Sequence, residues 1–241
     1  MISNTIFEQM FDLWLASQCP LDEVVRWGRF VERNPELRKQ TTLHHQHSVS
    51  MVIIPVLFNL KSRHYPKLNT ELMKDAFQWH DLPEGLLLQK KDISVVSKRA
   101  HHDLKEYSAF EQKIQHFMFT DFNLYIHFME AYLLQFAHKS DEYLSIFPED
   151  AITTITYLRE EYPYEVNLFP ALEKWEYLFY AYEGYLHYGD EVILVNVLRE
   201  HISELSRFAN EIVGFRDVVF PLHFEEAINK FIEDNKHVMA F

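Results

Sequence analysis

Apolar positions recur at intervals of three and four residues along nearly the whole chain, which is the period of an amphipathic helix. Clear stretches of this kind begin at Ile6, Val49, Leu72 and Val192. Alternating runs of β-branched residues, which would indicate strands, do not occur. Proline and glycine mostly fall between the apolar stretches and mark helix ends, so the pattern predicts an all-α protein of about nine or ten helices.

The helical stretches show no repeat of fixed length, which disfavours a helical solenoid. A soft boundary falls near Pro148, because most histidines precede it and an aromatic-rich stretch, 175–188, follows it. No linker separates the two parts. We therefore predict a helical core over residues 1–148 and a helical extension over residues 149–241 that packs on it. The aromatic stretch is interpreted as a packed helix, with a dimer contact as one role for its surface.

Composition and charge narrow the class further. Hydrophobic residues make up 48% of the chain, which suits an ordered globular protein. The chain has 23 basic and 36 acidic residues, and its net charge of −13 disfavours binding to nucleic acid or to an anionic membrane. Cys19 is the only cysteine, the longest apolar run (51–58) is too short to span a bilayer, and no signal peptide is recognisable. We expect a cytoplasmic protein.

The candidate chemistry centres on histidine, of which the chain has 14. The pair His80-Asp81 ends one apolar helical stretch and precedes a helix-stopping Leu-Pro-Glu-Gly segment. His47 opens an earlier apolar helix, and Asp141 lies on a later one. Two imidazoles and two carboxylates from three helices can converge on one divalent metal, and this set suits Mn, Co, Fe, Ni or Zn.

These residues carry a resemblance to the HD-domain metal-dependent phosphohydrolases, and within them to the bacterial 5′-deoxynucleotidase branch. It covers roughly the segment from Arg38 to Asp141, whereas nothing after Pro148 matches, and Lys91 stands where the family usually has glycine. The resemblance implies an all-helical bundle with one metal near its centre. It also implies hydrolysis of phosphate monoesters of nucleotides, commonly by a homodimer.

The resemblance further implies a role for each matching residue. The metal ligands would be His47, His80, Asp81 and Asp141. Three further residues would act on the substrate or the water: Glu84 as a carboxylate near the metal-bound water, Asp92 as a second polar residue of the pocket, and Arg38 as the arginine that contacts the phosphate. Nearby cations, among them Lys98, would offset the acidic net charge locally.

Two alternatives stay open. Some HD-domain proteins hold two metals, with extra histidines between the central His-Asp pair and the distal aspartate, where this chain has His102 and His127. Such a site would support phosphodiester hydrolysis or, with two irons, oxygenation. The scaffold could also serve as a non-catalytic binding or regulatory module. Beside His47, His44 is expected at the surface, and the pattern assigns His45 no role.

Overall fold

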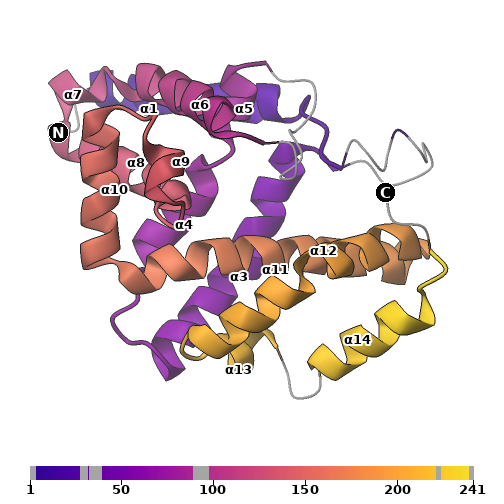
Figure 1. Ribbon diagram of the computed structural model, residues 1–241. Coiled ribbons are helices and arrows are strands. Elements are labelled where there is room, and N and C mark those ends of the chain that lie inside the picture. Colours follow the sequence, from indigo (N-terminus) through magenta and orange to yellow (C-terminus); the bar gives the residue numbers. More distant parts are fainter. Residues whose placement is uncertain (1–3, 28–31, 33–39, 89–97, 221–223, 239–241) are drawn as a thin grey trace. The chain divides into compact units, whose positions relative to one another are not determined.

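The computed structural model describes residues 4–27, 32, 40–88, 98–220 and 224–238 (Figure 1). These residues are helical nearly throughout and contain no strand, only one isolated antiparallel bridge between Val25 and Thr41. The prediction of an all-α protein is therefore confirmed. Within the described ranges, no helix combines the length and the hydropathy that crossing a bilayer requires.

The chain divides into two compact units. The described residues of 1–28, 39–50 and 71–163 form unit 1, and those of 29–38, 51–70 and 164–241 form unit 2. Within the expected core, the described residues of 29–38 and 51–70 belong to unit 2, and within the expected extension residues 149–163 belong to unit 1. The helix α3 (Thr42–Arg63) contributes to both units, so the break falls within a continuous helix and not at a loop.

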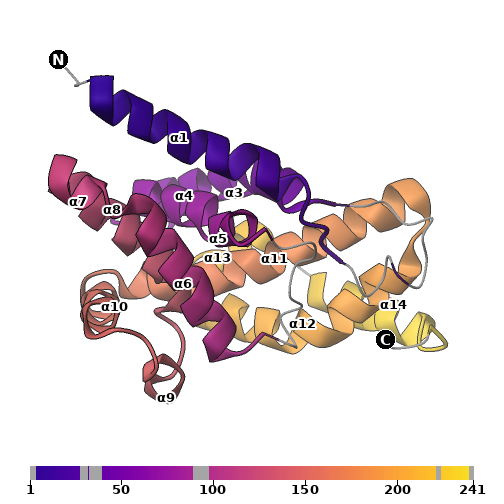
Figure 2. The ribbon, with the colours of Figure 1, turned by 90° about the horizontal axis from the view of Figure 1, so that it is seen from above.

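Unit 1 contains the first part of α3 and a series of further helices. These are α1 (Asn4–Leu21), α4 (Thr70–Trp79), α5 (Leu82–Leu86), α6 (Ala100–Ile114), α7 (Phe117–Thr120), α8 (Phe122–Leu133), the 3-10 helix η1 (Leu134–Phe136), α9 (Asp141–Leu144) and α10 (Glu149–Glu161). The short α5 packs against both α1 and α6 (Figure 2). A Cβ at Gly85 would lie 3.0 Å from Leu21, so glycine lets α1 approach α5 closely.

Aromatic side chains fill the core of unit 1. Phe110 of α6 stacks on Tyr132 of α8 with ring centroids 4.2 Å apart. Phe128, also on α8, lies edge-on to Trp79 of α4 at 5.4 Å. These rings are buried, and each contributes a large apolar area. His80 and Asp81, which directly follow Trp79, are buried as well.

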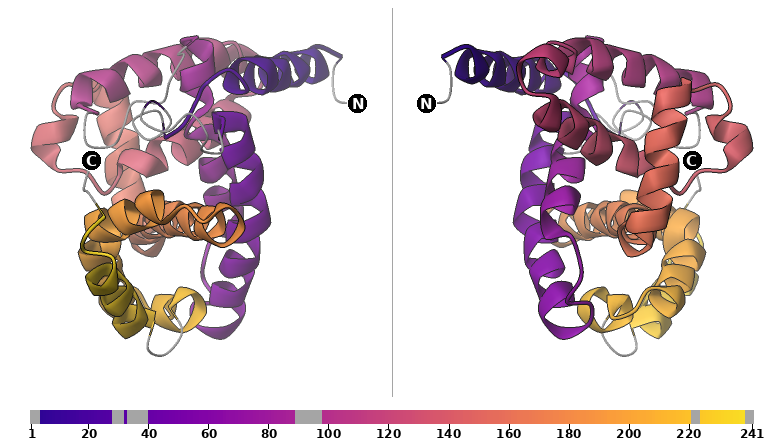
Figure 3. Two further views of the ribbon diagram at one scale, coloured as in Figure 1. Left: turned by 90° about the vertical axis from the view of Figure 1, so that its right-hand side faces the viewer. Right: turned by 90° about the vertical axis from the view of Figure 1, so that its left-hand side faces the viewer.

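Among the described residues, unit 2 contains the rest of α3 and four later helices. These are α11 (Pro163–Tyr188), α12 (Glu191–Glu211), α13 (Phe215–Val219) and α14 (Phe224–Asp234). The helix α12 packs against both α13 and α14 (Figure 3). Tyr164 stacks on Tyr65 with centroids 4.0 Å apart and donates a hydrogen bond to the carbonyl oxygen of Val213. Segments far apart in the sequence therefore meet in this unit.

Candidate metal centre

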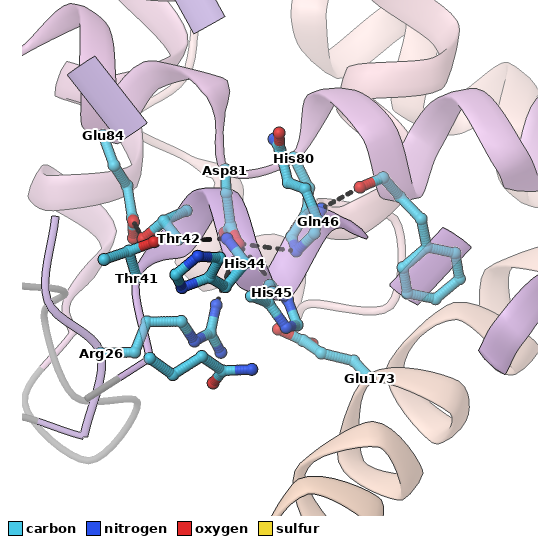
Figure 4. A network of polar contacts seen from close by, with 12 residues as sticks. Arg26, Thr41, Thr42, His44, His45, Gln46, His80, Asp81, Glu84 and Glu173 are labelled. Atoms are coloured by element: carbon cyan, nitrogen blue, oxygen red, sulfur yellow. Dashed lines mark hydrogen bonds and ion pairs between the residues drawn. The ribbon is translucent and has the colours of Figure 1, made fainter. Parts of the chain in front are cut away.

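Three buried side chains of unit 1 converge on one point. His45, His80 and Asp81 each offer a ligand atom, and these atoms all lie within 4.8 Å of one another. The Nε2 atoms of His80 and His45 lie 3.2 Å and 3.5 Å from Oδ2 of Asp81 (Figure 4). Two imidazoles and a carboxylate are ligands that divalent transition metals accept, so this group could hold a metal ion.

The helix α3 explains why His45 and not His47 faces this point. The buried stripe of α3 runs through Thr42, His45, Val49 and Ile53, at the helical spacing of three and four. His47 lies two residues beyond His45, which is about 200° around the helix. Its side chain is therefore exposed, as is that of His44.

The turn between α4 and α5 presents His80 and Asp81 together. The backbone N–H of His80 donates to Ala76, so the ring is held at the end of α4. Asp81 stands at the N-cap position of α5 but makes no cap hydrogen bond with its side chain. Pro83, early in α5, fixes the direction of the following turn. The carboxylate of Asp81 is thus available to its neighbours in the group.

The hydrogen bond on the other ring nitrogen of His80 supports its use as a ligand. Nδ1 of His80 lies 2.8 Å from the carbonyl oxygen of Phe77, which can only accept, so Nδ1 carries the proton. Nε2 is then the nitrogen that could bind a metal ion, because that nitrogen loses its proton when the ring acts as a ligand. Metal-binding histidines usually have their second nitrogen held in this way.

The charge of Asp81 fits the same interpretation. Burial raises the pKa of Asp81, but the neighbouring charges of His80, Arg26 and His45 outweigh burial and hold the pKa well below its usual value. A ligand carboxylate must be ionised, and this one is ionised throughout the neutral range.

Arg26 forms an ion pair with one member of this group, Asp81. Its Nη1 donates to Oδ2 of Asp81 over 3.0 Å, and its side chain is only 5% exposed. The bridge between Val25 and Thr41 positions it, because the backbone N–H of Arg26 donates to Gln40. Sequence reasoning missed Arg26, which is not part of the helical pattern.

Glu84 lies one turn after Asp81 and is buried. Its Oε2 accepts a hydrogen bond from Oγ1 of Thr42 over 2.9 Å, which ties α5 to the start of α3. Lys98 adds a positive charge nearby, with Nζ 2.8 Å from Glu106 and 3.3 Å from Asp103. Burial lowers the pKa of Lys98, but the charges of Glu106, Asp103 and Glu84 raise it well above its usual value, so Lys98 stays protonated.

The other expected site residues lie elsewhere. Asp141 has a side chain that is 91% exposed, and it pairs with Arg159 over 2.7 Å at the surface. The structure therefore brings together His80 and Asp81 of the four expected ligands and does not bring His47 or Asp141 to them. Arg38 and Asp92 lie outside the described residues.

The histidines of the two-metal alternative also lie outside the group of His45, His80 and Asp81. Nδ1 of His102 accepts the backbone N–H of Arg99 at the start of α6. His127 pairs with Asp75, its Nε2 lying 2.6 Å from Oδ2. Neither histidine belongs to a cluster of potential metal ligands among the described residues.

The pair of His127 and Asp75 predicts a small pH dependence of stability. The hydrogen bond to Asp75 raises the pKa of His127 against the effect of burial, and the charges of Asp75, Glu130 and Glu71 add to the rise. The pKa of His127 in the unfolded chain is about 6.5, and its pKa in the folded protein is higher. The pair therefore contributes its full stabilisation at pH values below the unfolded pKa, and this contribution is lost as the pH rises through the folded pKa.

We expect His127→Gln to lower the free energy of unfolding at pH 5.5 by less than about 1 kcal/mol, since the pair is partly exposed. At pH 9 we expect no difference from the wild type. Urea unfolding at both pH values measures this, with the exposed His237→Gln as control. A loss that is equal at both pH values would show that packing, not charge, is responsible.

No protein-family model matches the chain, no curated protein matches it, and no solved structure matches its fold. The fold and the group of His45, His80 and Asp81 therefore define it as an all-α protein with a candidate metal centre.

Proposed function

We propose that this protein is a metal-dependent phosphohydrolase that removes phosphate from a (deoxy)nucleotide or a related small phosphate ester. The observation that carries the proposal is the convergence of His45, His80 and Asp81 in the interior of unit 1. The resemblance of residues 80–84 to the nucleotidase branch supports the choice of reaction. The expectations of a homodimer and of a cytoplasmic location stay predictions.

The chain supplies groups for each further task of hydrolysis. A metal ion held by the group would lower the pKa of a water molecule and so provide the nucleophile near neutral pH. Glu84 is our candidate to orient that water or to protonate the leaving alcohol, because Thr42 fixes one of its oxygens. Arg26 is our candidate to hold the phosphate oxygens through its planar guanidinium.

The predicted roles of Arg38 and Asp92 remain predictions. Arg38 would contact the phosphate in addition to Arg26, and Asp92 would complete the polar pocket. A screen of nucleotides and small phosphate esters, with Mn²⁺ or Co²⁺ supplied, tests the reaction itself. One metal per chain is expected, whereas two irons per chain would favour the oxygenase alternative.

Glu84→Gln tests the role of this carboxyl group. The amide retains the size of the side chain but cannot transfer a proton, so we expect kcat to fall by about 10²- to 10⁴-fold. Metal content should not change. Asp141→Asn is the matched control, since this carboxylate lies at the surface and should be dispensable for turnover. Wild-type kcat in Glu84→Gln would remove Glu84 from the mechanism.

The ion pair of Arg26 and Asp81 favours a second candidate function, a non-catalytic binding or regulatory scaffold. Oδ2 of Asp81 already has one guanidinium and two imidazoles within 3.5 Å. The guanidinium, together with the imidazoles in their protonated form, can balance the carboxylate charge without a metal. A chain that works in this way would bind no metal and would hydrolyse none of the esters.

Arg26→Ala separates the two candidates. In a phosphohydrolase, losing a bidentate phosphate contact should lower kcat/KM by about 30- to 1000-fold. Metal affinity should stay equal or rise, because a competing cation has left Asp81. In the scaffold, the same change leaves a buried carboxylate without its cation and lowers stability with no metal bound in either form. Metal titration and urea unfolding of the two proteins distinguish these results.

A further inference from the structure

Unit 2 contains a cavity of about 480 Å³ between α11, α12, α13 and α14. Ligand pockets commonly measure about 300–1,000 Å³. A dry cavity of about 150 Å³ holds one benzene molecule, so this one has room for several rings. The cavity is therefore large enough for a small-molecule ligand.

Among the described residues, the side chains that line this cavity are all apolar or aromatic. Their only polar groups are the hydroxyls of Tyr182 and Tyr185 and the indole N–H of Trp175. A charged ligand would lose its hydration here without meeting an opposite charge. The lining consequently selects an uncharged molecule.

The aromatic stretch of α11 supplies most of the rings. Trp175, Phe179, Tyr182 and Tyr185 recur at spacings of three and four and so share one helix face. Trp175 and Phe179 lie with centroids 5.8 Å apart, and Tyr185 meets Phe231 of α14 edge-on at 5.3 Å. Such walls favour flat rings, which can stack on their faces or meet their edges.

Two of the side chains that line the cavity also reach the surface. Phe179 is 43% exposed and Tyr182 is 50% exposed, although both line the cavity. Leu194 and Leu198 of α12 also line the cavity, and both are buried. A ligand can thus enter past two rings and reach an aliphatic floor.

We propose that this cavity binds an uncharged, planar, multi-ring molecule. The described residues that line it belong to unit 2, whereas His45, His80 and Asp81 belong to unit 1, and the proposal does not depend on the proposed phosphohydrolase activity. It also gives the aromatic stretch of α11 a role beyond packing.

The probe for this site is N-phenyl-1-naphthylamine, which is uncharged and aromatic and fluoresces in apolar surroundings. Titration of the full chain should give saturable binding of one probe per chain. Ala227→Phe puts a ring into the cavity from α14 and should weaken binding at least tenfold. Asn229→Phe adds the same ring to the same helix away from the lining and should leave affinity unchanged.

Circular dichroism checks that each variant is folded. If Ala227→Phe fails to fold, Phe179→Ala replaces it, because this side chain is partly exposed, and it should weaken binding at least threefold. Absence of saturable binding, or equal affinity in the cavity variant and its control, would overturn the proposal. Displacement of the probe by 1-dodecanol more readily than by 2-naphthol would assign the cavity to an alkyl chain and overturn the ring assignment.

Discussion

His45→Ala is expected to abolish metal binding, and His47→Ala is expected to leave it unchanged. The imidazole of His45 lies in the buried group with His80 and Asp81, whereas that of His47 is exposed on the opposite face of α3. Losing a residue that only supports a ligand costs about 10- to 100-fold in affinity. Loss of the ligand itself should therefore cost at least about 100-fold.

Isothermal titration with Mn²⁺ or Co²⁺ measures this difference, and phosphate release should follow the same order. The two substitutions remove the same side chain from the same helix, so their effects on helix stability are closely matched. Strong metal binding by His45→Ala together with loss of binding in His47→Ala would contradict the assignment. The centre would then use the ligand that the sequence resemblance implies.

Gly214→Ala is expected to destabilise unit 2 by about 2–5 kcal/mol. Gly214 has φ of +78°, where an L-residue is strained by about 1–2 kcal/mol. A Cβ at this position would also lie 2.3 Å from Cγ of His64. A movement of the backbone at the start of α13, or of the His64 ring, cannot relieve both the backbone strain and the steric clash.

Gly189→Ala is the matched control for this prediction. Gly189 also has positive φ, +66°, but a Cβ there meets nothing within 4 Å, so only the backbone strain applies. We expect this variant to lose about 1 kcal/mol. Urea unfolding followed by circular dichroism compares the two. Equal losses would show that His64 does not approach Gly214 closely.

His64→Gly in the Gly214→Ala background should recover part of the loss. It removes both atoms of His64 that the new Cβ would meet most closely, whereas the strain of the positive φ remains. A double-mutant cycle gives the coupling free energy of the two positions. A coupling near zero would contradict the close approach.

The pattern of apolar residues was sufficient to predict the helical class, because helix formation depends on local spacing along the chain. The same local reasoning located the turn at His80 and Asp81, since an apolar helix ends there and Pro83 follows. Both residues are members of the buried group. Residues that are adjacent in one turn lie close together regardless of how the rest of the chain packs.

The third member of the group depended on which face of α3 is buried. His45 lies on the stripe that also contains Thr42, Val49 and Ile53, and this stripe was visible in the sequence as a spacing of three and four. The sequence-based prediction nevertheless chose His47 as the ligand, because His47 matches the family pattern. Helical geometry then excludes His47, because two residues correspond to more than half a turn.

Contacts between segments that are far apart in the chain could not be predicted from the sequence. Arg26 contacts Asp81 because the bridge between Val25 and Thr41 positions it. Asp141 pairs with Arg159 at the surface and does not join the buried group. The sequence by itself determined the helical class and the His80-Asp81 turn, because these follow from neighbours along the chain, whereas Pro20 and Pro170, expected to end helices, lie inside α1 and α11. Only the tertiary structure decided which histidine, which arginine and which carboxylates meet there, because that depends on how buried faces pack.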